Sequence, residues 1–125
     1  MNVIGRRQWA IAEGYNPPYS HGPAPQMVSH EAICILNSGD AEAHVGILIY
    51  YEGRDPVGPY RFTIAPRRTR HLGFNNFEEP EKIQLDTPFS SVISSDVPIV
   101  VQHTRLDSRQ AENALLSTIA FPGID

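Results

Sequence analysis

Two polar segments of the sequence have the residue types needed to bind a ligand. Trp9 and Glu13 place an aromatic ring and a carboxylate just before a proline-rich stretch. Much later, the apolar run 99–101 changes abruptly into a polar segment. Three of its side chains alternate along the chain and therefore share one face of a strand: His103, Arg105 and Asp107. A polar face at the end of a buried strand needs partners, because an unpaired buried charge is costly.

The partners of this polar face could lie within the chain, in another subunit or in a ligand. Within the chain, Glu13 and Glu31 could pair with Arg105. An aromatic ring beside polar groups would also suit a sugar or a carboxylate ligand. The predicted ligand-binding residues are therefore Trp9, Glu13, His30, Glu31, His103, Arg105 and Asp107.

The sequence lacks the spacings that are typical of metal and catalytic sites. Its five histidines include no H-x-H pair, and Cys34 follows four residues after His30, where a zinc-protease motif has a second histidine. His30, Glu31 and His103 could still converge on a metal, but hydrogen-bonded strand histidines are the simpler expectation. Cys34 lies among apolar residues and is expected to be buried and unreactive. Neither a G-x-S-x-G elbow nor a phosphate-binding P-loop occurs. We therefore expect no enzyme activity, no metal and no cofactor.

One basic cluster stands out in an otherwise acidic chain: Arg67, Arg68 and Arg70. On a strand, Arg68 and Arg70 would share a face and could bind an acidic partner or a nucleic-acid backbone. The alternative is an edge strand that its charges protect from aggregation.

The composition points to a soluble protein of one domain. The chain has 125 residues and a net charge of −4, whereas a dedicated nucleic-acid binder usually has a basic excess. Its single cysteine excludes an intramolecular disulfide and suits the reducing cytoplasm. We see neither a signal peptide nor an apolar run of membrane-spanning length, so we expect no membrane insertion. Charged residues make up only 19% of the sequence, which fits a protein that hides surface in an oligomer.

Short segments rich in β-branched residues alternate with turns, because eleven prolines and nine glycines leave little room for helices. The strands expected from this pattern span residues 7–12, 28–36, 43–51, 60–64, 69–74, 91–94, 98–106 and 115–121. Turns are expected at 37–40, 53–56 and 58–59, and a short helical turn or ordered loop at 107–114.

These strands predict an all-β, single-domain antiparallel β-sandwich over residues 1–125, jelly-roll-like and with about eight strands. Strand 28–36 is apolar on both faces, which indicates a central strand or one covered by a neighbouring subunit. Strand 69–74 is expected to pair with strand 60–64. The last strand should close the domain with Ile119 and Phe121 on one face.

Several motifs, in order along nearly the whole chain, resemble the cyanobacterial (Anabaena) sensory rhodopsin transducer family. They lie at residues 9–15 with the proline pair 17–18, and at 29–31, 34–37, 50–51, 56–60 and 97–113. Each motif is unspecific alone, but together, from about Ile4 to Phe121, they are highly specific.

The resemblance implies a cytoplasmic β-sandwich that forms a homotetramer and docks on the cytoplasmic face of a membrane photoreceptor. Retinal would belong to the receptor, so the chain would need no chromophore. The family also implies two alternatives, a small-ligand module and a DNA-linked regulator. The sequence departs from the family pattern near Gly73 and Asn76, where charge is lost, and in the tail 122–125.

Overall fold

The computed structural model describes residues 4–16, 30–107 and 114–124, and most of them lie in strands. The elements are β1 (Arg6–Tyr15), β2 (His30–Asn37), β3 (Ala43–Tyr51), β4 (Arg54–Ile64), β5 (Arg68–Gly73), the 3₁₀ turn η1 (Phe74–Asn76), β6 (Pro88–Asp107), β7 (Ala114–Ile119) and β8 (Phe121–Pro122). All strand pairs are antiparallel. The predicted all-β fold of about eight antiparallel strands is confirmed. In the described ranges, no helix is long and apolar enough to cross a membrane.

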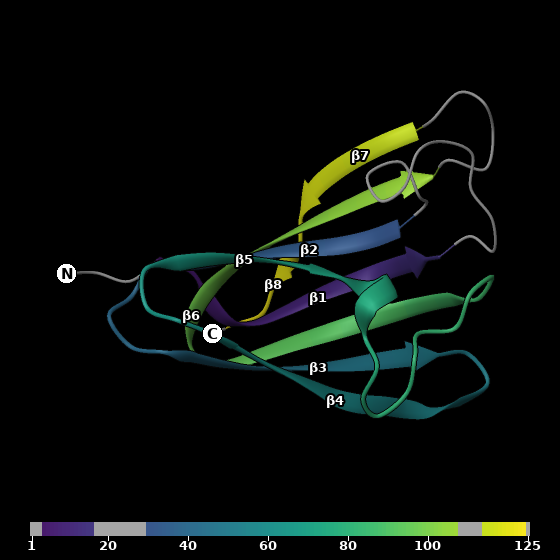
Figure 1. The fold of residues 1–125 in the computed structure, drawn as a ribbon, viewed down its shortest axis with the longest axis horizontal. Coiled ribbons are helices and arrows are strands. Elements are labelled where there is room, and N and C mark those ends of the chain that lie inside the picture. The colour runs from purple at the N-terminus through teal and green to yellow at the C-terminus, as the bar shows by residue number, and fades with distance from the viewer. Residues whose placement is uncertain (1–3, 17–29, 108–113, 125) are drawn as a thin grey trace.

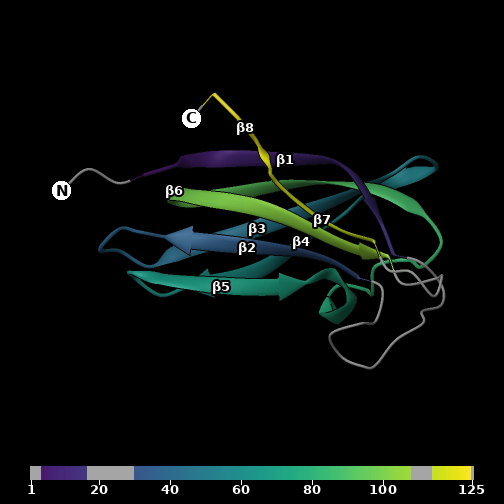
Figure 2. The same cartoon turned by 90° about the horizontal axis from the view of Figure 1, so that it is seen from above.

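The strands form two layers that share the long strand β6 (Figures 1 and 2). The first half of β6 lies between β1 and β3, and this layer continues to β4 on one side and β8 on the other. The second half of β6 lies between β2 and β7, and β5 pairs with β2. Figure 1 shows β6 running along one layer, bending, and returning along the other. The result is a sandwich-like fold in which one strand joins both layers.

The core lies between the two layers. Ile47 and Ile49 of β3 and Ile33 and Ile35 of β2 have no exposed surface, and all four belong to one continuous hydrophobic cluster. These residues recur at every second position, as expected for strands with one face buried. Strand β2 is central, between β5 and β6, as its apolar sequence predicted. Its other face is partly open, since Leu36 is 40% exposed.

The segments predicted as strands 91–94 and 98–106 are parts of one strand, β6. Pro98 suggested a boundary, because proline cannot donate a ladder hydrogen bond. In β6 this proline lies within residues 96–98, which have no register partner, where the strand leaves the first layer and enters the second. The missing N–H is therefore not needed there, and the strand continues through the bend.

The predicted pairing of strand 69–74 with strand 60–64 is wrong. Strand β5 pairs instead with β2, with His71 opposite Cys34 and Leu72 opposite Ile33. Arg67, in the connection, has a φ of 56° and donates its N–H to the carbonyl of Gly39 at 3.1 Å. This bond redirects the chain from one layer to the other, so that Leu72 becomes buried over the core instead of extending a hairpin.

The remaining differences concern the strand ends. Strand β4 begins at Arg54, and the Gly58–Pro59 pair lies inside it, at a register shift against β3, instead of ending it. The last predicted strand is divided into β7 and β8. Ile119 and Phe121 are 63% and 75% exposed, while Ala120 between them is buried. Most of the expected helical turn at 107–114 lies outside the described residues.

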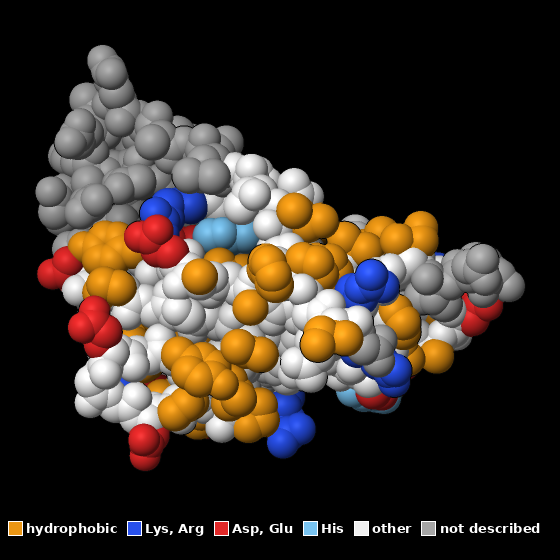
Figure 3. Space-filling model, turned by 180° about the vertical axis from the view of Figure 1, so that it is seen from behind, with side chains coloured by type: hydrophobic (Ala, Val, Ile, Leu, Met, Phe, Trp, Pro, Cys, Tyr) orange, Lys and Arg blue, Asp and Glu red, His pale blue; other side chains and the backbone are white. Residues whose placement is uncertain are grey.

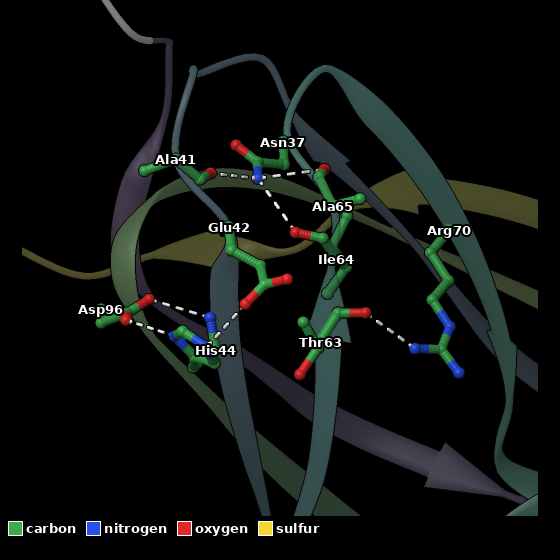
Figure 4. A network of polar contacts seen from close by, with 9 residues as sticks. All are labelled: Asn37, Ala41, Glu42, His44, Thr63, Ile64, Ala65, Arg70 and Asp96. Carbon is green, nitrogen blue, oxygen red and sulfur yellow. Dashed lines mark hydrogen bonds and ion pairs between the residues drawn. The ribbon is translucent and has the colours of Figure 1, made fainter.

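Side chains from three strands hold the end of the sandwich where β6 bends (Figure 4). His44, at the start of β3, contacts Asp96 of β6 twice, through its backbone N–H at 2.8 Å and its ring Nδ1 at 2.7 Å. The buried amide of Asn37 donates to the carbonyls of Ala41, Ile64 and Ala65. These contacts fix the turns that connect the two layers.

Candidate functional site

A buried carboxylate, Glu31, is the centre of the polar cluster. It lies on β2 in the same inward-facing row as Ile33 and Ile35, and it has no exposed surface. Arg105 of β6 is its direct cross-strand partner and donates from Nε to Glu31 Oε2 at 2.7 Å. The His103 ring contacts the other carboxylate oxygen, Oε1, through Nε2. Of the two partners within the chain that the sequence allows for Arg105, Glu13 and Glu31, the structure assigns Glu31.

Strand β1 completes the surroundings of Glu31. The backbone N–H of Tyr15 donates to Glu31 Oε2 at 2.6 Å, and the Glu31 N–H donates to the side-chain oxygen of Asn16 at 3.2 Å. The bonds to the Glu31 carboxylate are charge-assisted, about twice as strong as neutral ones, and offset the cost of burying it. Asn16 is itself fully buried, and in the part of the chain that the structure describes its amide nitrogen has no hydrogen-bond partner. The cluster therefore ties β1, β2 and β6 together.

A cleft of about 330 Å³ opens beside this cluster, between β1 of one layer and the segment β7–β8 that leads from the other. His103, Arg105, Glu13 and Thr118 contribute its polar groups. The rest of the lining is apolar and consists of Ala10, Ile11, Ala12, Ile119, Ala120 and Phe121. Small-molecule sites are usually concave and mostly apolar, with a few convergent polar groups, and this cleft has that character. Figure 3 shows how, on one face of the molecule, hydrophobic patches lie among charged and histidine side chains.

The structure brings four of the seven predicted ligand-binding residues together. Glu13, His103 and Arg105 line the cleft, and Glu31 lies buried behind the two basic side chains. Trp9 does not join them, because its indole is 95% buried in the core and donates to the carbonyls of Arg6 and Ile99. His30 and Asp107 are known by backbone position only: His30 is opposite Leu106, and Asp107 is opposite Ala114.

The residues that form the other wall of the cleft are not among those that the sequence predicts for the site. The sequence pattern places Thr118, Ile119 and Phe121 in a closing strand. The exposure of Ile119 and Phe121 follows from the positions of β7 and β8, each at the edge of its layer, which a single sequence does not reveal. Tyr15 and Asn16 were also missed, because their contacts with Glu31 depend on how β1 crosses β2.

The basic residues 67, 68 and 70 do not form a uniformly free patch. Arg67 is paired with Asp40 at 2.8 Å. Arg70 donates to the carbonyl of Thr63 at 2.9 Å (Figure 4) and lies over the ring of Phe62. Arg68 bonds the carbonyl of its neighbour Arg67 and is exposed. Arg70 thereby bridges β5 and β4, the outer strands of the two layers.

The histidines and the cysteine make no metal cluster within the described ranges. There, no group of three or more His, Cys, Asp or Glu side chains lies close enough to hold a metal ion. Cys34, expected to be buried, is only half-buried, and its sulfur lies 3.3 Å from the hydroxyl of Thr69.

Comparisons with known proteins agree with the motifs in the sequence. The profile of the family described as Anabaena sensory rhodopsin transducer matches residues 4–122. A solved structure titled "Anabaena sensory rhodopsin transducer" is 60% identical, with a TM-score of 0.77, and the match covers 83% of this chain and all of that one. A second, titled "Crystal Structure of Thermotoga maritima 1070", is 33% identical over 98% of this chain and 97% of that one, with a TM-score of 0.82. No curated protein matches. With the family profile spanning nearly the whole sequence, the chain belongs to the Anabaena sensory rhodopsin transducer family.

Proposed function

We propose that this protein is a non-enzymatic transducer that binds a membrane photoreceptor in the cytoplasm as a homotetramer. The observation that carries the proposal is the family match over residues 4–122, together with the 60% identical relative that is named a sensory rhodopsin transducer. No chromophore is required of the transducer itself, since retinal belongs to the receptor. Exposed apolar side chains, among them Tyr50, Ile119 and Phe121, leave surface that subunit contacts could cover.

The charge distribution supports docking through one end of the sandwich. The turn between β3 and β4 and the loop 77–86 lie together, since Arg54 contacts Glu81 at 2.9 Å and the Tyr51 hydroxyl accepts from the N–H of Gln84. Residues 52–55 and 77–86 carry six carboxylates against two cations. Cytoplasmic loops of membrane proteins carry an excess of Lys and Arg. We therefore propose this acidic end as the surface that meets the receptor.

Binding to a purified sensory rhodopsin in lipid nanodiscs tests the proposal. We expect saturable binding that weakens as salt is raised, because exposed charges are screened. Replacing the exposed Glu78 and Glu79 by glutamine should weaken binding several-fold. The matched control is Asp40→Asn with Glu42→Gln, which removes two charges at the opposite end of β3, roughly 30 Å away for a nine-residue strand.

Three results would overturn parts of this proposal. Absence of saturable binding to the receptor would reject the transducer function. Equal effects of the two double substitutions would reject the acidic end as the docking surface. Light scattering should give four times the 13.9 kDa chain mass, and a monomer at micromolar concentration would reject the tetramer.

The structure gives less support to a DNA-linked role. Arg67 and Arg70, two of the three basic residues proposed for nucleic acid, already contact Asp40 and Thr63. Assembly into an oligomer could still strengthen the weak DNA binding of one basic patch, because several patches would bind together. If this role held, DNA binding would fall steeply between low and moderate salt and would be reduced by Arg68→Gln.

A further inference from the structure

The two open sides of the sandwich are closed differently. On the β4–β5 side, Arg70 reaches from one layer to the other, bonds the carbonyl of Thr63 and covers the ring of Phe62. On the β1–β7 side, the corresponding cation, Arg105, is turned back toward Glu31 of its own layer. The cleft lies on this side, so a cation faces a cavity there instead of sealing it.

Arg105 is held in a fixed orientation with its outer nitrogens available. Its Nε is bound to Glu31 Oε2, and among the described residues neither of its two Nη atoms has a partner. The side chain is 25% exposed and lines the cleft. A guanidinium presents parallel donors that match the two oxygens of a carboxylate. Glu31 thus acts as a positioning residue, because its contact leaves the Nη edge of Arg105 for a ligand.

The other lining residues define what kind of anion would fit. Thr118, opposite His103 in the β6–β7 register, is exposed and brings a hydroxyl donor to the same cavity. Ile119 and Phe121 supply an apolar wall. The volume of about 330 Å³ is at the lower limit for small-molecule sites, which suits a small ligand.

Glu13 adds a negative charge to the same lining. A second carboxylate on the ligand would be repelled by it, because like charges a few ångströms apart in a partly dry site cost free energy. We propose that the cleft binds a small monocarboxylate, with its carboxylate on Arg105 and Thr118 and a short apolar tail against Ile119 and Phe121. This site is independent of receptor docking, so it can hold whether or not the proposed function does.

The probe is butyrate, titrated into the full chain while backbone amide resonances are recorded by NMR. We expect saturable shifts confined to the strands around the cleft, at residues 10–13 and 118–121. Butyramide, which has nearly the same shape but no charge, should bind at least tenfold more weakly. Succinate, which adds a second carboxylate, should also bind more weakly than butyrate. Equal binding of butyramide, or saturable binding of glucose at the same residues without butyrate binding, would overturn the proposal.

Variants assign the contacts. Arg105→Lys keeps the charge but loses the planar fork and should weaken butyrate binding about tenfold or more. Thr118→Val keeps the shape but loses the hydroxyl and should weaken it several-fold, while the exposed Thr63→Val on β4 serves as the matched control and should change nothing. If Arg105→Lys does not fold, as judged by its melting transition, the butyrate affinity of Thr118→Val tests the site instead. Butyrate affinity unchanged in Thr118→Val, or no saturable shift in the wild-type chain, would reject the site.

Discussion

Glu31 of β2 and Arg105 of β6 lie directly opposite each other in the antiparallel register, joined by a 2.7 Å contact from Nε to Oε2. The carboxylate has no exposed surface, while the arginine side chain reaches the cleft. The pair is thus both part of the core and part of the candidate site.

Arg105→Ala should destabilise the fold because it leaves Glu31 buried with one counter-charge fewer. Breaking a buried pair in this way costs about 3 kcal/mol. Urea unfolding followed by circular dichroism measures the loss. Arg67→Ala is the control, since its pair with Asp40 is mostly exposed and should contribute about 1 kcal/mol or less. Equal losses in the two variants would show that the Glu31–Arg105 pair does not stabilise the core.

Asn37→Ala should destabilise the end of the sandwich shown in Figure 4. One buried amide group serves the carbonyls of Ala41, Ile64 and Ala65, and its oxygen accepts from the N–H of Gly39. We expect a loss of about 2 kcal/mol, the usual cost when buried polar groups lose their partner.

The nearly isosteric substitution Asn37→Asp tests the donor role of the Asn37 amide directly. It places carboxylate oxygens where the structure requires a donor to three carbonyls. At pH 7 it should destabilise the protein at least as much as Asn37→Ala in urea unfolding. A fully stable Asn37→Asp variant would contradict the donor role of this amide.

Gly5→Ala should be strongly destabilising, because Gly5 has a φ of +119° and its backbone packs against β6. An added Cβ would lie 2.0 Å from the carbonyl oxygen of Ile99. Gly53→Ala is the matched control, since an added Cβ there meets nothing within 4 Å. Thermal melting of both variants checks the difference. If Gly5→Ala had the same melting temperature as the wild type, the start of β1 would be able to shift without a loss of stability.

The His44–Asp96 contact should make stability depend on pH. The hydrogen bond to the Asp96 carboxylate and the negative charge of Asp96 raise the pKa of His44, and Glu42, 3.1 Å from the His44 ring, adds to the rise. The hydrogen bonds that Asp96 accepts, first from the backbone N–H and then from the ring of His44, lower the pKa of Asp96. A raised histidine pKa means that the imidazolium form stabilises the fold. Its contribution is present below the unfolded pKa, near 6.5, and is lost as the pH rises through the folded pKa. Asp96 contributes above its ordinary pKa and loses its contribution as the pH falls through its lowered value.

Comparing the melting temperature of wild type and His44→Gln between pH 5 and 8 tests this coupling. The difference should be largest at acidic pH and should shrink as His44 deprotonates. His71→Gln is the control, because this exposed histidine lies on β5, away from Asp96. A pH-independent difference for His44→Gln would exclude the imidazolium as the stabilising form.

The alternation of apolar residues predicted the strands well wherever one face is buried. Strand β3 was predicted with its observed bounds, and Val45, Ile47 and Ile49 point inward. The pattern could not reveal that β6 is continuous through Pro98, because partner changes along a strand depend on the tertiary fold. It also could not place β5 beside β2, since the positive φ at Arg67 is not a property of arginine in general.

The candidate site was also predicted only in part, because some of its residues stand out in the sequence and others are placed by the tertiary fold alone. The polar residues His103 and Arg105 interrupt an apolar strand and therefore stand out in the sequence. Trp9 stands out equally by type, but its indole N–H is satisfied by two carbonyls in the core. Thr118 and Ile119 carry no local signal, because only the edge position of β7 places them at the cleft.

The shared strand β6 has a consequence for how the molecule unfolds. Since its first half holds β1 and β3 and its second half holds β2 and β7, neither layer keeps its central strand if the other comes apart. Unfolding should therefore be a single cooperative event, with the amides of β2 and β3 exchanging with solvent at a common rate set by global opening. A molecule bound at either layer would then slow the exchange of backbone amides in both layers.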